Sequence, residues 1–349
     1  MDHTFHPTST PTGSSSARQR GAALLSAMVI VTLVATLSAS MVWQQWRAVQ
    51  VEGAERVRSQ AGWVLTGALD WARLILREDQ RSGGADHLGE PWAIPLAEAR
   101  LSTFLAASTE NNAEAVDDSA EAFLSGRVED ATSRYNLRNL LDAEGKIAPN
   151  ELLVLRRLCE YSGLSPNLAD GIADAWRRAS LAVQASQLQD PDVLSALGGA
   201  DGLTSAPLLP QSAEQLTWLG LDAATVERLR TVVTVLPDAT KVNLNTAPRE
   251  VLAAVIDGVD LGRAARLVQV RQRTPFKSTA DVVSVLGAGN WDLSRLAVTS
   301  EYFEVRGRLR YEDHVIEQRH LVQRSGGDVV VRHQSRFSGM DLGGSSPPQ

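Results

Sequence analysis

The sequence predicts an α+β protein with a long N-terminal helix and an antiparallel sheet, and with a large all-α segment inserted between the early and late strands of that sheet. Three observations support this fold class. An uncharged apolar run extends from Ala22 to Trp43, and its helical periodicity continues beyond Trp43. Between about residues 147 and 295, apolar residues recur at helical spacing, whereas after residue 300 they alternate with polar ones. With 349 residues, the chain is long enough for two or three domains.

The N-terminal helix is expected to cross a membrane once. Arg18 and Arg20 precede Gly21, and no charged residue follows until Arg47. Because a helix rises about 1.5 Å per residue, this run covers the roughly 30 Å of a bilayer's hydrocarbon core. Basic residues lie on both sides of the run, so charge bias does not fix its direction, although the short leader makes a cytoplasmic N-terminus the simpler choice. We expect the helix to extend from Ala22 to about Leu76.

The residues leave three interpretations of the N-terminus open. In the first, the run is a secretory signal peptide that is cleaved after Ser38-Ala39-Ser40, so that the mature chain begins at Met41. In the second, it is an anchor that is never cleaved. In the third, the junction of Gly21 and Ala22 is a prepilin peptidase site, since a small residue there separates a basic leader from an unbroken apolar helix. Cleavage at that bond would make Ala22 the new N-terminus and retain the helix.

The rest of the chain divides where its periodicity changes. A strand is expected at Phe123–Glu129, and alternation predicts further strands at 303–311, 315–322 and 329–332. Helices are expected at 150–161, 167–183, 213–219, 223–235, 248–256, 261–273 and 279–286. The predicted division is a leader at 1–21, a transmembrane part at 22–43, a helix extension and first part of the α/β domain at 44–146, the inserted helical domain at 147–298, C-terminal strands at 299–337 and a disordered tail at 338–349.

Part of the insertion, residues 241–287, resembles a helix-hairpin-helix DNA-binding module. Such hairpins bind phosphate through glycine amides at a helix N-terminus, and Gly258–Gly262 would be the hairpin here. Asp257 and Asp260 would repel phosphate, and the chain carries a net charge of −7. Basic residues nearby offset these two carboxylates in part: Arg263, Arg266, Arg271, Arg273 and Lys277. We therefore expect a packing unit that binds no nucleic acid, and a membrane-anchored DNA-binding or uptake protein remains the alternative function.

No catalytic motif is present, so we do not expect an enzyme. The sequence has no nucleophile elbow, phosphate-binding loop or zinc-protease motif. The single cysteine, Cys159, follows the helical pattern of Leu152, Leu155 and Leu158, which predicts a buried structural thiol. His87 lies next to Asp86 near a predicted turn, and we expect it to make local hydrogen bonds there.

Four segments together resemble one known family. They are Arg20–Leu25 without a glutamate at position 26, Asp86–Ala93, Gly126–Asp130 followed by Arg134–Leu140, and Val242–Pro248. In this order they resemble the minor pseudopilin K family of the type II secretion system, also called general secretion pathway protein K. Most subunits of such filaments carry glutamate at the fifth mature position, which is Ser26 here. A carboxylate in the membrane costs about 2.5–3.5 kcal/mol, and a subunit with no neighbour above it has no use for one.

The resemblance implies a specific cellular role. It implies cleavage between Gly21 and Ala22 by prepilin peptidase, N-methylation of Ala22, and a single-pass protein of the bacterial inner membrane whose body faces the periplasm. The protein would cap the tip of the pseudopilus and initiate its assembly on the inner-membrane platform, with minor pseudopilins I and J as partners, for export of folded proteins across the outer membrane. It also implies calcium, for which the tentative candidates are Glu129, Asp130, Asp117 and Asp118.

Overall fold

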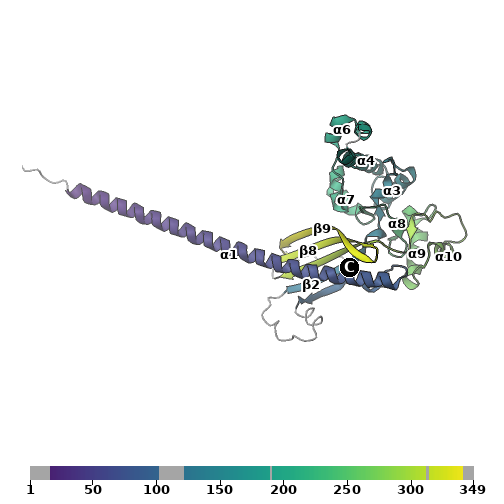
Figure 1. Cartoon of the computed structure of the whole chain (residues 1–349), viewed down its shortest axis with the longest axis horizontal. Helices are drawn as coiled ribbons and strands as arrows, with labels where there is room; N and C mark the ends of the chain where they lie inside the picture. The colour runs from purple at the N-terminus through teal and green to yellow at the C-terminus, as the bar shows by residue number, and fades with distance from the viewer. Residues whose placement is uncertain (1–15, 102–121, 189–190, 312–313, 341–349) are drawn as a thin grey trace, which may run out of the picture. The chain divides into compact units, whose positions relative to one another are not determined.

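The computed structural model describes residues 16–101, 122–188, 191–311 and 314–340, and the chain divides into two units, Met1–Trp63 and Val64–Gln349. The first unit consists of the N-terminal part of helix α1, Ser16–Ser82 (Figure 1). The large apolar side chains of α1 from Leu24 to Val51 are 54–66% exposed. The apolar window of this helix has a mean hydropathy of 2.2, which is apolar enough to cross a membrane. The expected helix from Ala22 to Leu76 is therefore confirmed, and it continues to Ser82.

The second unit contains a five-stranded antiparallel sheet on which the C-terminal part of α1 packs (Figure 1). The strand order is β1-β2-β7-β8-β9, with bounds Leu96–Arg100, Ala122–Asp130, Tyr302–Tyr311, His314–Ser325 and Asp328–Met340. Strands β2 and β7 pair along their whole length, from Ala122 opposite Tyr311 to Asp130 opposite Phe303. The early strand and the late strands thus share one sheet, as the α+β prediction requires, and the chain between Asp130 and Tyr302 leaves and re-enters the sheet at one end.

Two paired glycines lie in the sheet close to where α1 packs on it. Gly126 and Gly307 lie opposite each other in β2 and β7. A Cβ at Gly307 would come within 3.0 Å of Leu65 Cδ2 on α1, and a Cβ at Gly126 would come within 2.9 Å of the Arg306 carbonyl oxygen. Next to this gap, Leu69, Ala72 and Leu76 of α1 are buried together with sheet residues that include Phe303, Val305 and Val322. The absence of a side chain at Gly307 thus makes room for Leu65 of α1, and its absence at Gly126 lets β2 lie close to the β7 backbone.

The insertion is mainly helical. Its α-helices are α3 (Pro149–Tyr161), α4 (Leu168–Leu188), α5 (Pro191–Ala196), α6 (Gly199–Ser205), α7 (Ala223–Leu229), α8 (Arg249–Val255), α9 (Leu261–Arg273) and α10 (Val282–Leu286). Short 3₁₀ helices occur at Pro91–Ala93, Ala131–Ser133, Leu137–Leu140, Ala213–Leu219 and Thr279–Asp281. One hydrophobic core joins α3, α4, α7, α8, α9 and α10, and it includes the single cysteine, Cys159, which is fully buried. The predicted burial of that thiol is confirmed, and burial raises the pKa of Cys159 to about 11.

Two details of the insertion differ from the sequence-based expectation. The helix expected at 223–235 ends at Leu229, because Val233–Thr234 form strand β4 and pair with β3, Tyr135–Asn136. A second short parallel pair joins β5, Val242–Asn243, to β6, Leu296–Ala297. At Val233–Thr234, backbone hydrogen bonds to a distant segment thus replace the expected helical ones, whereas the β5–β6 pair forms in stretches for which no element was predicted. The sequence analysis also missed α5 and α6, which are short.

The C-terminal strand is longer than expected. Alternation predicted a strand at 329–332 and a disordered tail from residue 338, but β9 continues to Met340. The polar run after Arg332 has no apolar alternation, yet it pairs with β8 as far as Met340 opposite His314. The expectation of disorder is therefore wrong for residues 338–340, because backbone pairing to a long neighbouring strand forms the strand without an apolar face. Residues 341–349 lie outside the described part of the chain.

Candidate functional site

The predicted processing junction lies near the beginning of α1. The helix includes Gly21 and Ala22, and Ser26 is exposed one turn further along. The Ser26 hydroxyl donates a hydrogen bond to the carbonyl of Ala23 at 2.9 Å, and Thr32 and Thr36 do the same to Val29 and Leu33. These small polar side chains are thereby satisfied by their own helix, which a membrane segment requires. The cleavage itself stays a prediction.

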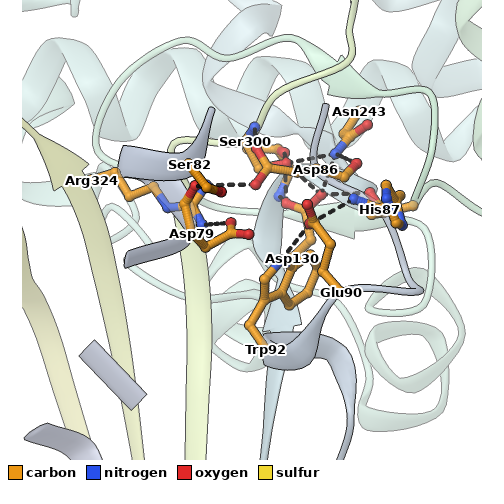
Figure 2. Close-up of polar contacts among 12 residues, drawn as sticks. Asp79, Ser82, Asp86, His87, Glu90, Trp92, Asp130, Asn243, Ser300 and Arg324 are labelled. Carbon is orange, nitrogen blue, oxygen red and sulfur yellow. Dashed lines mark hydrogen bonds and ion pairs between the residues drawn. The ribbon is translucent and has the colours of Figure 1, made fainter. Parts of the chain in front are cut away.

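A second candidate site lies where α1, the sheet and the insertion meet. We call it the polar junction and define it as Asp79, Asp86, Asp130, Asn243, Ser300 and Arg324 (Figure 2). Asp79 comes from the last turns of α1, Asp130 from the end of β2, and Arg324 from β8. Asn243 comes from β5 in the insertion. All except Asp79 are buried, so this polar cluster lies inside the protein where hydrogen bonds and charges must be satisfied internally.

The charged half of the junction consists of two aspartates that share one arginine. Arg324 Nη1 donates to Asp86 Oδ1 at 2.5 Å, and its Nη2 donates to Asp79. The Arg324 guanidinium also lies over the Phe303 ring, with Cζ 4.4 Å from the ring centroid. Burial raises the pKa of both Asp79 and Asp86, and the nearby Glu90 carboxylate raises that of Asp79 further. The attraction of Arg324 does not fully offset the cost of burying these two carboxylates.

The other half of the junction is organised around the Asp130 carboxylate. Its Oδ2 accepts hydrogen bonds from Asn243 Nδ2 at 3.0 Å, Ser300 Oγ at 2.6 Å and Thr246 Oγ1 at 2.5 Å. Its Oδ1 accepts from the backbone N–H of Thr132 at 2.8 Å and from the Thr132 hydroxyl at 2.7 Å. Protein donors thus surround both oxygens of this buried carboxylate.

Two contacts connect the halves. Ser300 N donates to Asp86 Oδ2 at 2.6 Å, and Asn243 Nδ2 lies 3.1 Å from the Asp86 carbonyl oxygen. The side chain of Asn243 therefore contacts both β2 and the segment that follows α1. Because a buried polar network costs free energy unless its members are partnered, it favours one arrangement of these segments over others. The arrangement can hold the insertion in place.

The calcium candidates are placed in different surroundings. Glu129 lies 2.9 Å from Arg127 and 3.4 Å from Arg306 in ion pairs, while Asp130 is surrounded by the donors described above. Asp117 and Asp118 lie outside the described residues. Within the described part of the chain, the carboxylates of Asp79, Asp86 and Glu90 come within 4.8 Å of one another.

This acidic group does not fit a calcium site in the observed arrangement. Arg324 already bonds Asp79 and Asp86, and Glu90 Oε2 accepts from Trp92 Nε1 at 2.6 Å and from His87 N at 3.0 Å. A cation would have to displace a guanidinium from these oxygens. The calcium expectation thus stays a prediction without a ligand set among the described residues.

Sequence motifs identified part of the polar junction. Asp86, Asp130 and Asn243 belong to segments that carried the family resemblance, and the local bond expected of His87 is present, since Gly89 N donates to its Nδ1 at 3.1 Å. Asp79, Ser300 and Arg324 were missed. A signal for Arg324 exists, because it follows Val322 by two residues and so lies on the buried face of β8.

The hairpin that resembled a DNA-binding module is used for packing. Gly258 adopts a positive φ of 80°, and Arg263 Nη1 donates to its carbonyl oxygen at 3.0 Å. Arg271 is buried and donates to the Leu244 carbonyl at 2.6 Å, and burial lowers its pKa to about 10. Two of the five basic residues that could have offset Asp257 and Asp260 therefore bond to the protein itself. The geometry gives the DNA-binding alternative no support.

Comparisons with known proteins agree with the resemblance. Two models described as type II secretion system protein K match residues 133–238 and 242–306. The type II secretion system protein K of Pseudomonas aeruginosa is 29% identical over 333 residues, covering 92% of this chain and 93% of the relative. That of Pectobacterium carotovorum is 28% identical, covering 90% and 95%.

A solved structure has the same fold. It is a chain in the GspK–GspI–GspJ complex from the type 2 secretion system of enterotoxigenic Escherichia coli. The TM-score is 0.58 at 19% sequence identity, and the match covers 81% of this chain and 98% of the other. This likeness confirms the predicted α+β fold class.

Proposed function

Because the chain belongs to the type II secretion system protein K family, we propose that it is a minor pseudopilin that caps the tip of the pseudopilus and starts its assembly for export of folded proteins across the outer membrane. The single observation that carries this proposal is the position of the insertion. It leaves the sheet after Asp130 and returns at Tyr302, at the end of the sheet where α1 finishes, and the polar junction connects it to both. A bulky domain fixed at that end would obstruct the stacking of another subunit on top.

The N-terminus supports the same position. Ser26 stands where most filament subunits carry a glutamate, and its hydroxyl is satisfied within its own helix. A terminal subunit needs no carboxylate to pair with the amine of a neighbour above it. We propose cleavage between Gly21 and Ala22, N-methylation of Ala22, and retention of the apolar helix as a single span of the inner membrane with the body in the periplasm.

Minor pseudopilins I and J are the proposed partners. The structurally similar chain is part of a complex with GspI and GspJ. In this protein, α1 exposes Trp71 and Leu74 to 50% each on a helix that also packs on the sheet. We expect a partner helix to cover such residues, and we expect prepilin peptidase and the inner-membrane assembly platform to act on the same helix before and during assembly.

Mass spectrometry of the N-terminus tests the proposal. Protein purified from secreting cells should begin at methylated Ala22, and Gly21→Leu should retain the leader and abolish secretion. Gly53→Leu is the matched control, since a Cβ there meets nothing within 4 Å, and it should be processed normally. A mature chain beginning at Met41 would instead identify a signal peptide, and normal secretion by an unprocessed Gly21→Leu variant would overturn the proposal.

A further inference from the structure

Among the described strands, one edge of the sheet is formed by the longest strand. Strand β9, Asp328–Met340, is the outer strand beside β8, whereas the opposite edge is the much shorter β1, Leu96–Arg100. An edge strand presents a row of backbone N–H and C=O groups that can pair with another strand, and proteins usually shorten or cover such edges. We therefore expect a long edge strand either to pair with another strand or to carry features that prevent such pairing.

The outer side of β9 is accessible over most of its length. At its beginning, Arg73 of α1 donates to the Val329 carbonyl at 2.8 Å. The β8–β9 register shifts at Arg332, which lies between the pairs Val331–Val322 and His333–Leu321, and from His333 onward the backbone hydrogen bonds of β9 to described residues are those of the β8 ladder. Alternate side chains there, at Arg332, Gln334 and Arg336, are exposed, and no proline interrupts the strand.

The edge is basic although the protein as a whole is acidic. The chain has a net charge of −7, yet residues 329–340 contain Arg332, Arg336 and His333 and no aspartate or glutamate. Phe337 adds an apolar side chain that is 49% exposed, with the Arg319 guanidinium 4.8 Å from its ring centroid. Positive charge and an exposed aromatic ring thus lie along the same strand edge.

This charge pattern disfavours a second copy of the same edge. If two β9 strands paired antiparallel about Gln334, Arg332 of one would lie opposite Arg336 of the other. Like charges directly opposite on neighbouring strands are destabilising, whereas opposite charges stabilise the pair. An acidic strand would place a carboxylate against each of these arginines.

We propose that the outer edge of β9 binds an extended acidic segment of a partner protein, which adds a strand to the sheet. Backbone hydrogen bonds would supply sequence-independent affinity, and Arg332 and Arg336 would select for acidic residues at alternate positions. The proposal goes beyond the capping role and does not depend on it, because capping rests on the insertion, which leaves the sheet from β2 and returns to it at β7, whereas the proposed site is the outer side of β9.

Hydrogen exchange with two model peptides tests the proposal on the full chain in detergent. The probe is a seven-residue peptide with alternating glutamate and valine, and its control has lysine in place of each glutamate. We expect the acidic peptide to slow exchange of backbone amides between 333 and 339, and the basic peptide to leave it unchanged. Equal protection by both peptides, or by neither, would overturn the proposal. Amides at the outer edge that are already protected without peptide would also overturn it.

Charge reversal separates strand pairing from general attraction. The double variant Arg332→Glu with Arg336→Glu should bind the acidic peptide at least about tenfold more weakly and should gain affinity for the lysine peptide. Arg266→Glu, which reverses an exposed charge on α9 in the insertion, is the matched control and should bind as the wild type does. A similar loss of affinity in the Arg266→Glu variant would show that only net charge matters and would contradict a site at β9.

Discussion

The side chains of Asp79 and Asp86 share the single guanidinium of Arg324 at the polar junction. Burial raises the pKa of both carboxyl groups in the folded protein. A group whose pKa is higher in the folded than in the unfolded state stabilises the fold below the unfolded pKa, which is about 3.9 for aspartate. That contribution is lost as the pH rises through the folded pKa. These two aspartates therefore favour the folded state in mild acid rather than at neutral pH.

Asp79→Asn should reduce the loss of stability between pH 4 and pH 7. Asparagine keeps the shape of the side chain but does not titrate, so the free energy of unfolding of the variant should fall less over this range than that of the wild type. Denaturant unfolding of the full chain in detergent at both pH values measures this difference. Glu304, whose pKa is lowered by Arg306 and Arg134 against the effect of its burial, has the opposite pH dependence and is unchanged in the variant.

The control for this measurement is Asp201→Asn, at an exposed position in the first turn of α6. Its pH profile should follow that of the wild type. If Asp79→Asn also followed the wild type, the protonation of Asp79 would not be coupled to folding, and burial would not raise the pKa of this carboxyl group in the folded protein.

Asn243→Asp should be more damaging than Asn243→Ala. The Nδ2 of Asn243 faces Asp130 Oδ2 at 3.0 Å and Ser300 Oγ at 2.7 Å. Alanine leaves these acceptors with fewer donors, which costs about 1–3 kcal/mol. Aspartate also places a second carboxylate against Asp130, and an uncompensated buried charge costs roughly 3–5 kcal/mol.

Chemical denaturation of the full chain distinguishes the two variants. Asn290→Asp, at an exposed position, controls for the added charge and should be close to neutral. Equal effects of Asn243→Ala and Asn243→Asp would mean that solvent or a proton compensates the new carboxylate, and that the junction is less enclosed than its geometry indicates.

Sequence analysis at the residue scale found motifs but not the contacts between them. Asp86, Asp130 and Asn243 each belong to a recognisable local segment, and nothing in their spacing shows that they converge. Arg324 could not be assigned a partner, because Asp79 and Asp86 are more than two hundred residues away in sequence. Contacts of this kind depend on the order of strands in the sheet, which local periodicity does not determine.

At the element scale, Gly307 determines how closely α1 packs on the sheet, and Gly126 determines how closely β2 lies against β7. Gly126→Ala should destabilise the protein, because its Cβ would meet the Arg306 carbonyl oxygen at 2.9 Å and backbone cannot easily move. Gly307→Ala should be milder, because its Cβ would meet a flexible leucine side chain, Leu65, at 3.0 Å. We expect a cost of about 1–3 kcal/mol for the first substitution and less for the second.

Gly67→Ala in α1 is the matched substitution, since a Cβ there meets nothing within 4 Å. It should stabilise the helix by about 0.5–1 kcal/mol, because alanine favours helix more than glycine does. Thermal unfolding of the three variants measures their relative stabilities. A neutral Gly126→Ala would show that β2 and β7 can separate locally, so that their close approach does not depend on this glycine.

The elements that sequence predicted well are those with a clear period. The apolar run of α1, the alternation in β7 and β8, and the amphipathic α3 and α9 were all placed within a few residues. The elements that were missed or wrong are those formed by long-range backbone pairing. Val233–Thr234 has the apolar character of the preceding helix but pairs with Tyr135–Asn136, and the polar end of β9 pairs with β8. Their conformation depends on pairing with distant segments, which the local sequence does not identify.

At the scale of the whole molecule, the chain combines a polymer-forming element with a terminating one. The exposed apolar part of α1 is suited to lateral packing in a membrane or a filament. The insertion has its own hydrophobic core and is connected to the sheet by the polar junction. A subunit built in this way can add to a filament below it while preventing addition above it, so its number should be set by filament ends and not by filament length.

This gives a prediction about copy number. Overproduction of the major pseudopilin should lengthen pseudopili, and the ratio of this protein to the major subunit should then fall in proportion to length, because each filament keeps one capped end. Quantitative mass spectrometry of sheared filaments, with lengths measured by electron microscopy, tests this.

The matched variant is Asn243→Asp, which weakens the connection of the insertion to the sheet without altering α1. Filaments capped by this variant should be fewer, since initiation depends on the rigid cap. A ratio that stays constant as filaments lengthen would place the protein along the shaft, and would mean that the insertion does not obstruct stacking.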